Sequence, residues 1–112
     1  MTDRLPTHLA VGALLRRVND AGGLGTVLAR GDPDSGMVLI VIAERGGNYR
    51  LIERGMTADG RSALLPAGPS QADVQDIADY WQRRRRADPD LWVIELDIAQ
   101  AERLAAETIG IG

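Results

Sequence analysis

The chain has 112 residues and a formal net charge of −3; 45% of its residues are hydrophobic and 26% are charged. This composition predicts a single folded domain over residues 1–112 and excludes the intrinsically disordered class. The acidic balance gives no overall attraction to nucleic acid, so no nucleic-acid partner is expected. Cysteine and lysine are both absent, which excludes disulfide bonds, thiolate metal sites and catalytic lysines.

The first element expected is a helix that begins at Thr7 and is capped by the side chain of that residue. Apolar residues in this segment follow the i, i+3, i+4, i+7 spacing of a buried helical stripe. They are Val11, Leu14, Leu15 and Val18. Glycines at 22–23 predict the end of the helix, and a short strand is expected over 25–30.

The N-terminal residues 1–6 lack the basic and apolar regions of a signal peptide. No apolar run approaches the ~18 to 20 residues that a membrane-spanning helix needs. We therefore expect a cytoplasmic protein without a membrane partner.

Two copies of the pattern Arg-x-Asp-Pro-Asp, at 30–34 and 86–90, each lead into a run of strand-forming residues. Proline fixes its own φ and restricts the residue before it, and Asp side chains can accept hydrogen bonds from nearby backbone N–H groups. Each copy therefore predicts a turn. The helices do not superpose under the offset between the copies, so the pattern does not indicate an internal duplication.

The strand after the first turn is expected over 37–43, where every residue is apolar or small, so it should be central and covered on both faces. Residues 44–48 read as a hairpin loop before a third strand at 49–54. Residues 55–69 are rich in Gly and Pro and predict a loop, with a brief strand at 62–65.

A second helix is expected to begin after Ser70 as its N-cap, with an apolar face that includes Val74, Ile77 and Trp81. Aspartates occupy its first half and residues 83–86 are all arginine, an order that complements the helix dipole.

The last strand is expected over 91–97, with Trp92, Ile94 and Leu96 on one face. A short helix should follow to about Glu107, so the core spans about 7–107, and residues 108–112 are expected to be a loose tail. The order of elements predicts an α+β fold in which helices pack against one mostly antiparallel sheet.

These residues resemble the bacterial domain-of-unknown-function family 1491, a set of small uncharacterised proteins. The resemblance covers Arg4 to Arg103, and its most specific part is the Asp-Pro-Asp-Leu-Trp segment at 88–92. It also rests on segments 14–17, 31–36, 50–54, 79–81 and 95–97. The resemblance implies no reaction, substrate or cofactor, and no functional residues are carried over from it.

The spacing of Asp32, Asp34 and Gly36 is that with which a calcium loop begins. Because apolar residues occupy the positions of the later acidic ligands, a capped turn is favoured. The single histidine, His8, has no imidazole or thiol partner for a transition-metal site. No catalytic residue, metal site or cofactor is therefore predicted.

The arginine run at 83–86 cannot form one basic stripe, because successive residues are rotated by about 100° around the helix. Arg85 falls near the buried face and is expected to pair with a carboxylate of one of the two turns, as a structural clamp. The residues expected to have a structural or binding role are Arg30, Asp32, Asp34, Arg85, Arg86, Asp88, Asp90 and Trp92.

The sequence favours a non-catalytic protein-interaction or regulatory module with an unknown protein partner, which includes a homodimer through a sheet edge or an exposed aromatic residue. The alternative is a metal-dependent phosphodiesterase or nuclease-like enzyme that uses Asp32, Asp34 and Glu53. This alternative rests on the order of elements alone, and Gly55 stands where the expected catalytic lysine would lie.

Overall fold

The computed structural model describes residues 5–70 and 73–110, which fold as one α+β domain with a five-stranded sheet. In chain order the elements are α1 (Thr7–Asp20), β1 (Leu24–Ala29), β2 (Val38–Glu44), β3 (Gly47–Met56), β4 (Ser62–Ala67), α2 (Val74–Ala87), β5 (Trp92–Asp97), α3 (Ala101–Ala105) and the π-helical turn η1 (Ala106–Gly110). The fold class and the order of the main elements predicted from the sequence are confirmed.

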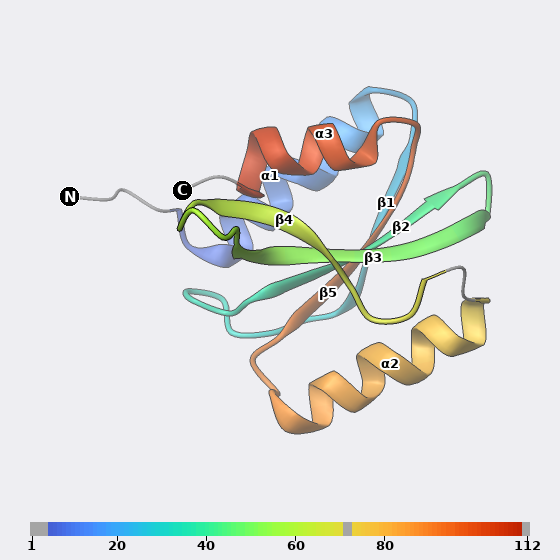
Figure 1. Ribbon diagram of the computed structural model, residues 1–112. Coiled ribbons are helices and arrows are strands. Elements are labelled where there is room, and N and C mark those ends of the chain that lie inside the picture. The colour runs from blue at the N-terminus through green and yellow to red at the C-terminus, as the bar shows by residue number, and fades with distance from the viewer. Residues whose placement is uncertain (1–4, 71–72, 111–112) are drawn as a thin grey trace.

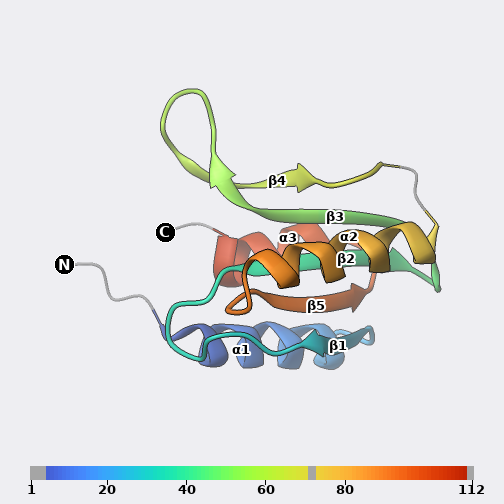
Figure 2. The ribbon, with the colours of Figure 1, turned by 90° about the horizontal axis from the view of Figure 1, so that it is seen from below.

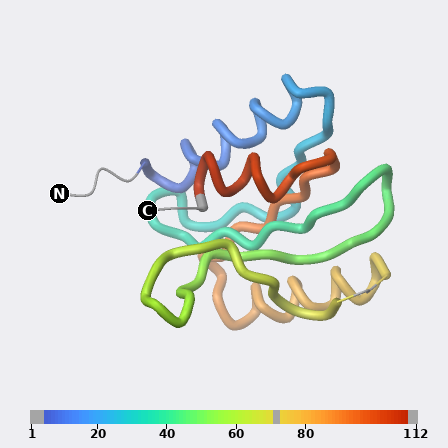
Figure 3. The backbone as a smooth tube through the Cα atoms, turned by 45° about the horizontal axis from the view of Figure 1, so that its top comes forward, coloured from blue at the N-terminus to red at the C-terminus, as the bar shows by residue number. Residues whose placement is uncertain are grey.

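The strands lie in the order β1-β5-β2-β3-β4. β2 and β5 are parallel, and the other neighbouring pairs are antiparallel. The uninterrupted apolar strand β2 is central, as its sequence predicts. Helices cover both faces of the sheet: α1 and α3 lie side by side on one face and α2 lies on the other (Figures 1 and 3).

We call the surface under α1, α3 and η1 the two-helix face and the surface under α2 the one-helix face. Side chains alternate between them along each strand, so Trp92, Ile94 and Leu96 of β5 all point to the two-helix face. Val93 points to the one-helix face and packs with Ile77 of α2. Figure 2 shows α2 crossing the one-helix face alone.

The start of α1 differs from the sequence prediction in how it is capped. The helix begins at Thr7, but Pro6 is the N-cap and no side chain caps the helix. The backbone N–H groups of Thr7 and His8 donate instead to the carbonyls of Asp34 and Pro33, at 3.1 and 2.9 Å. A turn distant in the sequence therefore accepts hydrogen bonds from the first N–H groups of the helix, which a neighbouring side chain usually caps. The predicted stop is confirmed, since Gly22 has a φ of +92° just after the helix.

The start of α2 lies one turn later than predicted. Asp73, not Ser70, is the N-cap, and it forms a capping box with Asp76. Asp and Ser are about equally favourable N-cap residues, so the local preference does not separate the two positions. With Asp73 as the N-cap, Val74 occupies the first helical position and is 59% exposed rather than part of the buried face.

The structure also differs from the sequence prediction at β4 and at the C-terminal end. β4 spans Ser62–Ala67 and is a full edge strand rather than a brief one. The segment expected to be loose from residue 108 continues the helix as η1 as far as Gly110. Arg17 donates to Glu107 and Thr108, and Arg54 donates to the carbonyl of Ile109. Residues 111–112 lie outside the described residues.

None of the helices in the described ranges has the length and apolar character that crossing a bilayer requires.

Candidate functional site

The two Arg-x-Asp-Pro-Asp turns lie against each other at one end of the sheet. This follows from topology: each turn feeds a strand, and the two strands, β2 and β5, are parallel neighbours that begin at the same end. The N–H of Asp32 donates to the carbonyl of Asp90 at 3.0 Å. A Cβ atom at Gly31 would lie 2.0 Å from that same carbonyl oxygen, so this contact requires glycine. We call the joined turns, residues 30–36 and 88–91, the corner.

One carboxylate of each turn, Asp32 in the first and Asp88 in the second, accepts hydrogen bonds from the backbone of its own turn. Asp32 accepts hydrogen bonds from the N–H groups of Asp34 and Ser35, at 3.1 and 2.8 Å, and from the Ser35 hydroxyl. These bonds, led by that of the Ser35 N–H, lower the pKa of Asp32. Asp88 accepts from the N–H of Asp90 at 3.1 Å. Both carboxylates therefore complete turns.

Trp92 joins the corner to the core. Its side chain is 1% exposed, and its indole N–H donates to the carbonyl of Asp32 at 2.7 Å. The guanidinium carbon of Arg30 lies 5.0 Å from the centre of the Trp92 ring, a cation–π contact that covers the ring at the protein surface. Trp92 is thus a buried anchor of the corner and is not an exposed aromatic residue that a partner could bind.

The arginine clamp is not the one expected. Arg85 donates to the backbone carbonyl of Pro89, not to a turn carboxylate. Asp32 and Asp88 already accept hydrogen bonds from their own turns, and an ion pair with Asp34 or Asp90, which are exposed, would contribute little to stability. Arg86 is exposed, as are Asp34 and Asp90. No hydrogen bond to the side chains of these three residues occurs within ranges 5–70 and 73–110.

The strongest polar contact lies elsewhere, between α2 and β3. The two terminal nitrogens of Arg84 donate to the two carboxylate oxygens of Glu53, at 2.8 and 2.9 Å, and one nitrogen also donates to the Tyr80 hydroxyl at 2.9 Å. The side chains of Arg84 and Glu53 are only 31% and 21% exposed. This fork raises the pKa of Arg84 further above its ordinary value, mainly through the hydrogen bond to Glu53.

Sequence reasoning missed this pair, although a signal was present. Arg84 lies seven residues after Ile77, which is about two helical turns, so both residues are on the same side of α2. Glu53 follows the buried residues Leu51 and Ile52 in β3. An arginine on the buried side of a helix needs an anion, and Glu53, until then considered only as an acid of the enzyme alternative, lies in a predicted strand of the sheet. The missing information was the placement of β3 beneath α2.

Two of the acidic residues that a metal site would need already have hydrogen-bond partners. Glu53 is occupied by Arg84, and Asp32 is occupied by its own turn. Among residues 5–70 and 73–110, no three His, Cys, Asp or Glu side chains are grouped so that they could hold a metal ion. The three acids that the enzyme alternative requires are therefore not brought together as a metal site in the described part of the chain.

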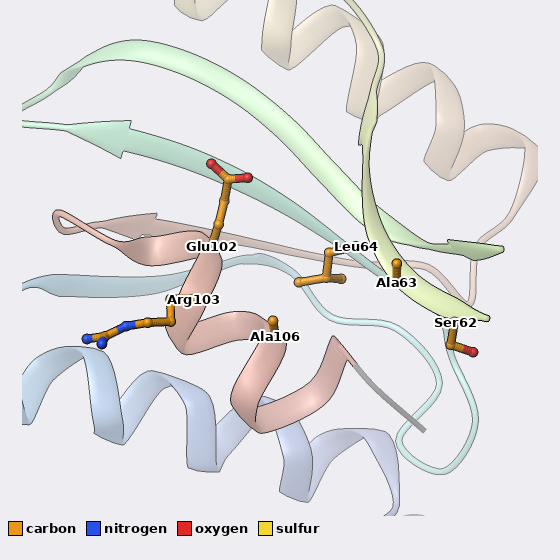
Figure 4. A pocket seen from close by; sticks show the side chains of 6 residues that line it. All are labelled: Ser62, Ala63, Leu64, Glu102, Arg103 and Ala106. Atoms are coloured by element: carbon orange, nitrogen blue, oxygen red, sulfur yellow. The ribbon is translucent and has the colours of Figure 1, made fainter. Parts of the chain in front are cut away.

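A shallow hollow lies between the edge strand β4 and the C-terminal helix. It has a volume of about 340 Å³. Its lining residues are Ser62, Ala63, Leu64, Glu102, Arg103 and Ala106. Figure 4 shows Leu64 pointing from β4 toward the helix, whereas the side chain of Arg103 points away from β4. Glu102, at the rim, pairs with Arg50 of β3. The hollow thus has an apolar floor beside an open strand edge.

The two edges of the sheet are not equally open. At β1, the N–H of Gly25 donates to the side chain of Asn19 at 3.1 Å, which satisfies one backbone donor of that edge. β4 contains no charged residue, and its Pro66 lies opposite Ile52 of β3. Proline is tolerated in an edge strand with its nitrogen on the open side, so the N–H of Leu64, two residues earlier, also faces the open edge. The open edge of β4 therefore presents backbone groups to which a further strand can be added.

Comparison with known proteins gives a consistent result. The family model described as "Protein of unknown function (DUF1491)" matches residues 5–106. The crystal structure of a DUF1491 family protein from Caulobacter crescentus CB15 is similar, with a TM-score of 0.78, 31% identity and coverage of 90% of this chain and 94% of that one.

Two solution structures are also similar. The NMR structure of a DUF1491 family protein from Caulobacter crescentus CB15 has a TM-score of 0.72 and 31% identity, and the match covers 89% of this chain and 91% of that one. The solution structure of a protein from A. tumefaciens has a TM-score of 0.69 and 29% identity, and the match covers 87% of this chain and 88% of that one. A comparison with curated proteins gives no match.

Proposed function

The chain belongs to the DUF1491 family of proteins of unknown function, and we propose that it is a non-catalytic interaction module that binds an extended segment of a partner protein at the open edge of β4. In this mode the partner adds a strand to the sheet. Backbone hydrogen bonds supply affinity, and pockets for alternate side chains supply specificity.

The observation that carries this proposal is the combination of an uncharged open edge with a hollow beside it. Natural edge strands are commonly protected by charged side chains, by proline or by a covering segment, and the proline of β4, Pro66, lies beyond Ser62–Leu65. β4 has neither a charge nor a side-chain cap of the kind that Asn19 gives β1. A strand added along Ser62–Leu65 would place alternate side chains over the hollow on the two-helix face. A segment with a small or medium apolar residue at that position fits best.

The contacts of the acidic residues support the non-catalytic part of the proposal. A phosphodiesterase would need free, converging carboxylates to hold its metal ions. Glu53 and Asp32 instead accept hydrogen bonds from Arg84 and from the first turn, respectively.

The edge assignment is tested with a pair of charge-introducing variants. Ala63→Lys places a charge on the open edge of β4, and Ala58→Lys makes the same change in the exposed turn before it. The partner is captured from native lysate, purified and titrated by calorimetry and by amide NMR. Ala63→Lys should weaken binding at least about tenfold, because a lysine on an edge strand disfavours the addition of another strand. Ala58→Lys should not weaken binding. The amide signals of Ser62–Ala67 should shift on titration. Binding that is unaffected by Ala63→Lys would contradict the assignment.

The non-catalytic assignment is tested by thermal denaturation with millimolar Mn²⁺, Mg²⁺ or Ca²⁺. We expect the Tm to stay unchanged, because a ligand raises the Tm only when it binds the folded state. A metal-dependent rise in Tm that Asp34→Ala abolishes would favour the phosphodiesterase alternative and overturn the proposal.

A further inference from the structure

The exposed face of α2 carries a self-complementary pattern of charge. Asp76, Asp79, Arg83 and Arg86 are all exposed. At about 100° per residue they fall within an arc of about 80°, on the side of the helix away from Ile77. The four charges therefore form one stripe about 15 Å long, acidic at the start of the helix and basic at its end.

The spacing within this stripe is symmetric. The intervals between the four residues are three, four and three positions, so reversal of the helix direction about Trp81 exchanges Asp79 with Arg83 and Asp76 with Arg86. Every charge is thereby placed opposite one of the other sign. A surface with this property is complementary to itself, which is the requirement for a twofold symmetric interface.

The charges of the stripe do not neutralise one another within the helix. Asp79 accepts a hydrogen bond from Gln75 at 2.9 Å, and the guanidinium of Arg83 lies 5.8 Å from the centre of the Tyr80 ring. No ion pair joins members of the stripe in the described part of the chain. The stripe therefore keeps its capacity to pair with an external surface.

We propose that a second copy of this chain docks through α2, with the two α2 helices antiparallel about a twofold axis that passes between the stripes at the level of Trp81 along the helix. Asp79 of each copy then pairs with Arg83 of the other, and Asp76 with Arg86. This surface lies on α2 rather than on β4, so the dimer does not depend on the partner-binding function proposed above. It leaves the open edge of β4 available in both copies.

Such an interface is polar, and its strength depends on salt. The Debye length is about 30 Å at 0.01 M salt and about 3 Å at 1 M, so pairing between exposed charges is strong only at low ionic strength. Analytical ultracentrifugation over a range of protein concentrations should detect a monomer–dimer equilibrium at low salt that shifts to monomer at high salt. A monomer at every concentration at low salt would overturn the proposal.

A charge-swap experiment identifies the surface. Asp79→Arg and Arg83→Asp each place like charges opposite one another in a homodimer, so each variant should dimerise at least about tenfold more weakly than the wild type. An equimolar mixture of the two variants restores opposite charges at both positions and should recover the dimer. Asp76 is left unchanged, because its carboxylate belongs to the capping box.

Two controls separate this effect from changes in folding or net charge. Thermal denaturation should show both variants folded, since both substituted positions are exposed. Asp20→Arg makes the same charge change on α1 and should leave the dimer intact. The assigned interface would be contradicted if the wild type dimerised and neither α2 variant weakened the dimer. It would also be contradicted if each variant alone were monomeric and their mixture stayed monomeric.

Discussion

On the two-helix face, α1 and α3 contribute to a cluster of twelve buried residues, whereas the cluster on the one-helix face has six, and Ile77 is the single fully buried residue that α2 contributes among the described residues. Apolar burial therefore fixes α1 and α3. α2 is held instead by a few contacts, which include the fork of Arg84 on Glu53.

This difference shows that one face of a sheet can supply most of the buried apolar surface while the helix on the other face keeps its own surface free for contacts with other molecules. The buried cluster under α1 supplies the main hydrophobic stabilisation. A helix that buries little apolar surface keeps most of its own surface exposed, and α2 presents its charged stripe there. Local opening of α2 should require less free energy than opening of α1.

The largest predicted effect comes from the two-helix face. Leu14→Ala removes a side chain that is 0% exposed, and it should lower the free energy of unfolding by about 3 to 5 kcal/mol. Ile77→Ala on the other face should cost about 2 kcal/mol, because its half-exposed neighbours can close part of the cavity. Urea unfolding measures both values. Equal losses would show that the two faces contribute alike.

The corner provides the next test, because it joins the strands that carry both faces. Gly31→Ala would place Cβ 2.0 Å from the carbonyl oxygen of Asp90, so the turns must separate, and we expect a loss of about 3 kcal/mol. Gly12→Ala is the matched control. Its nearest contact is at 3.5 Å in a helix interior, and it should gain about 0.5 to 1 kcal/mol. A neutral Gly31→Ala would contradict the tight contact between the turns.

The polar attachment of α2 is tested at Arg84. Arg84→Ala leaves Glu53 mostly buried without its partner and should cost about 1 to 3 kcal/mol. Arg83→Ala, on the exposed side of the same helix, should change stability by less than about 0.5 kcal/mol. Urea unfolding of Arg84→Ala, Glu53→Ala and the double variant Glu53→Ala/Arg84→Ala gives the coupling free energy, with Arg83→Ala measured alongside as the control. No coupling between the two positions would show that burial alone holds α2.

The smallest effect is expected at Glu95, on the one-helix face. Burial, with a further contribution from Asp97, raises the pKa of Glu95 above its ordinary value. Since the folded state binds this proton more tightly, stability is lost as the pH rises from the ordinary Glu value through the raised pKa. Glu95→Gln should therefore give a small rise in Tm at pH 7 that disappears in acid. Glu44→Gln, at an exposed hairpin position, should show no such pH-dependent gain.

Local features of the sequence were sufficient to predict most of the elements. The apolar spacing from Val11 to Val18 predicted α1, and the uninterrupted apolar run of β2 predicted a central strand. The Asp-Pro-Asp patterns predicted both turns. These signals are readable because helical spacing, strand propensity and proline geometry act between residues close in the chain.

The candidate site was less predictable. The contact between the turns follows from the parallel pairing of β2 with β5, which are separated by two strands and a helix in the chain. The choice of Arg84 over Arg85 depends on β3 lying beneath α2. The capping of α1 by Pro33 and Asp34 depends on the same long-range packing.

The sequence by itself determined the α+β class, the turn chemistry of the aspartates and the absence of thiol and lysine chemistry. Tertiary structure alone decided which arginine meets a carboxylate, which strands form the edges of the sheet and which face of α2 remains exposed. The physical reason is that strand order and helix placement result from the burial of surfaces contributed by distant segments. No local pattern of residues specifies how those segments combine.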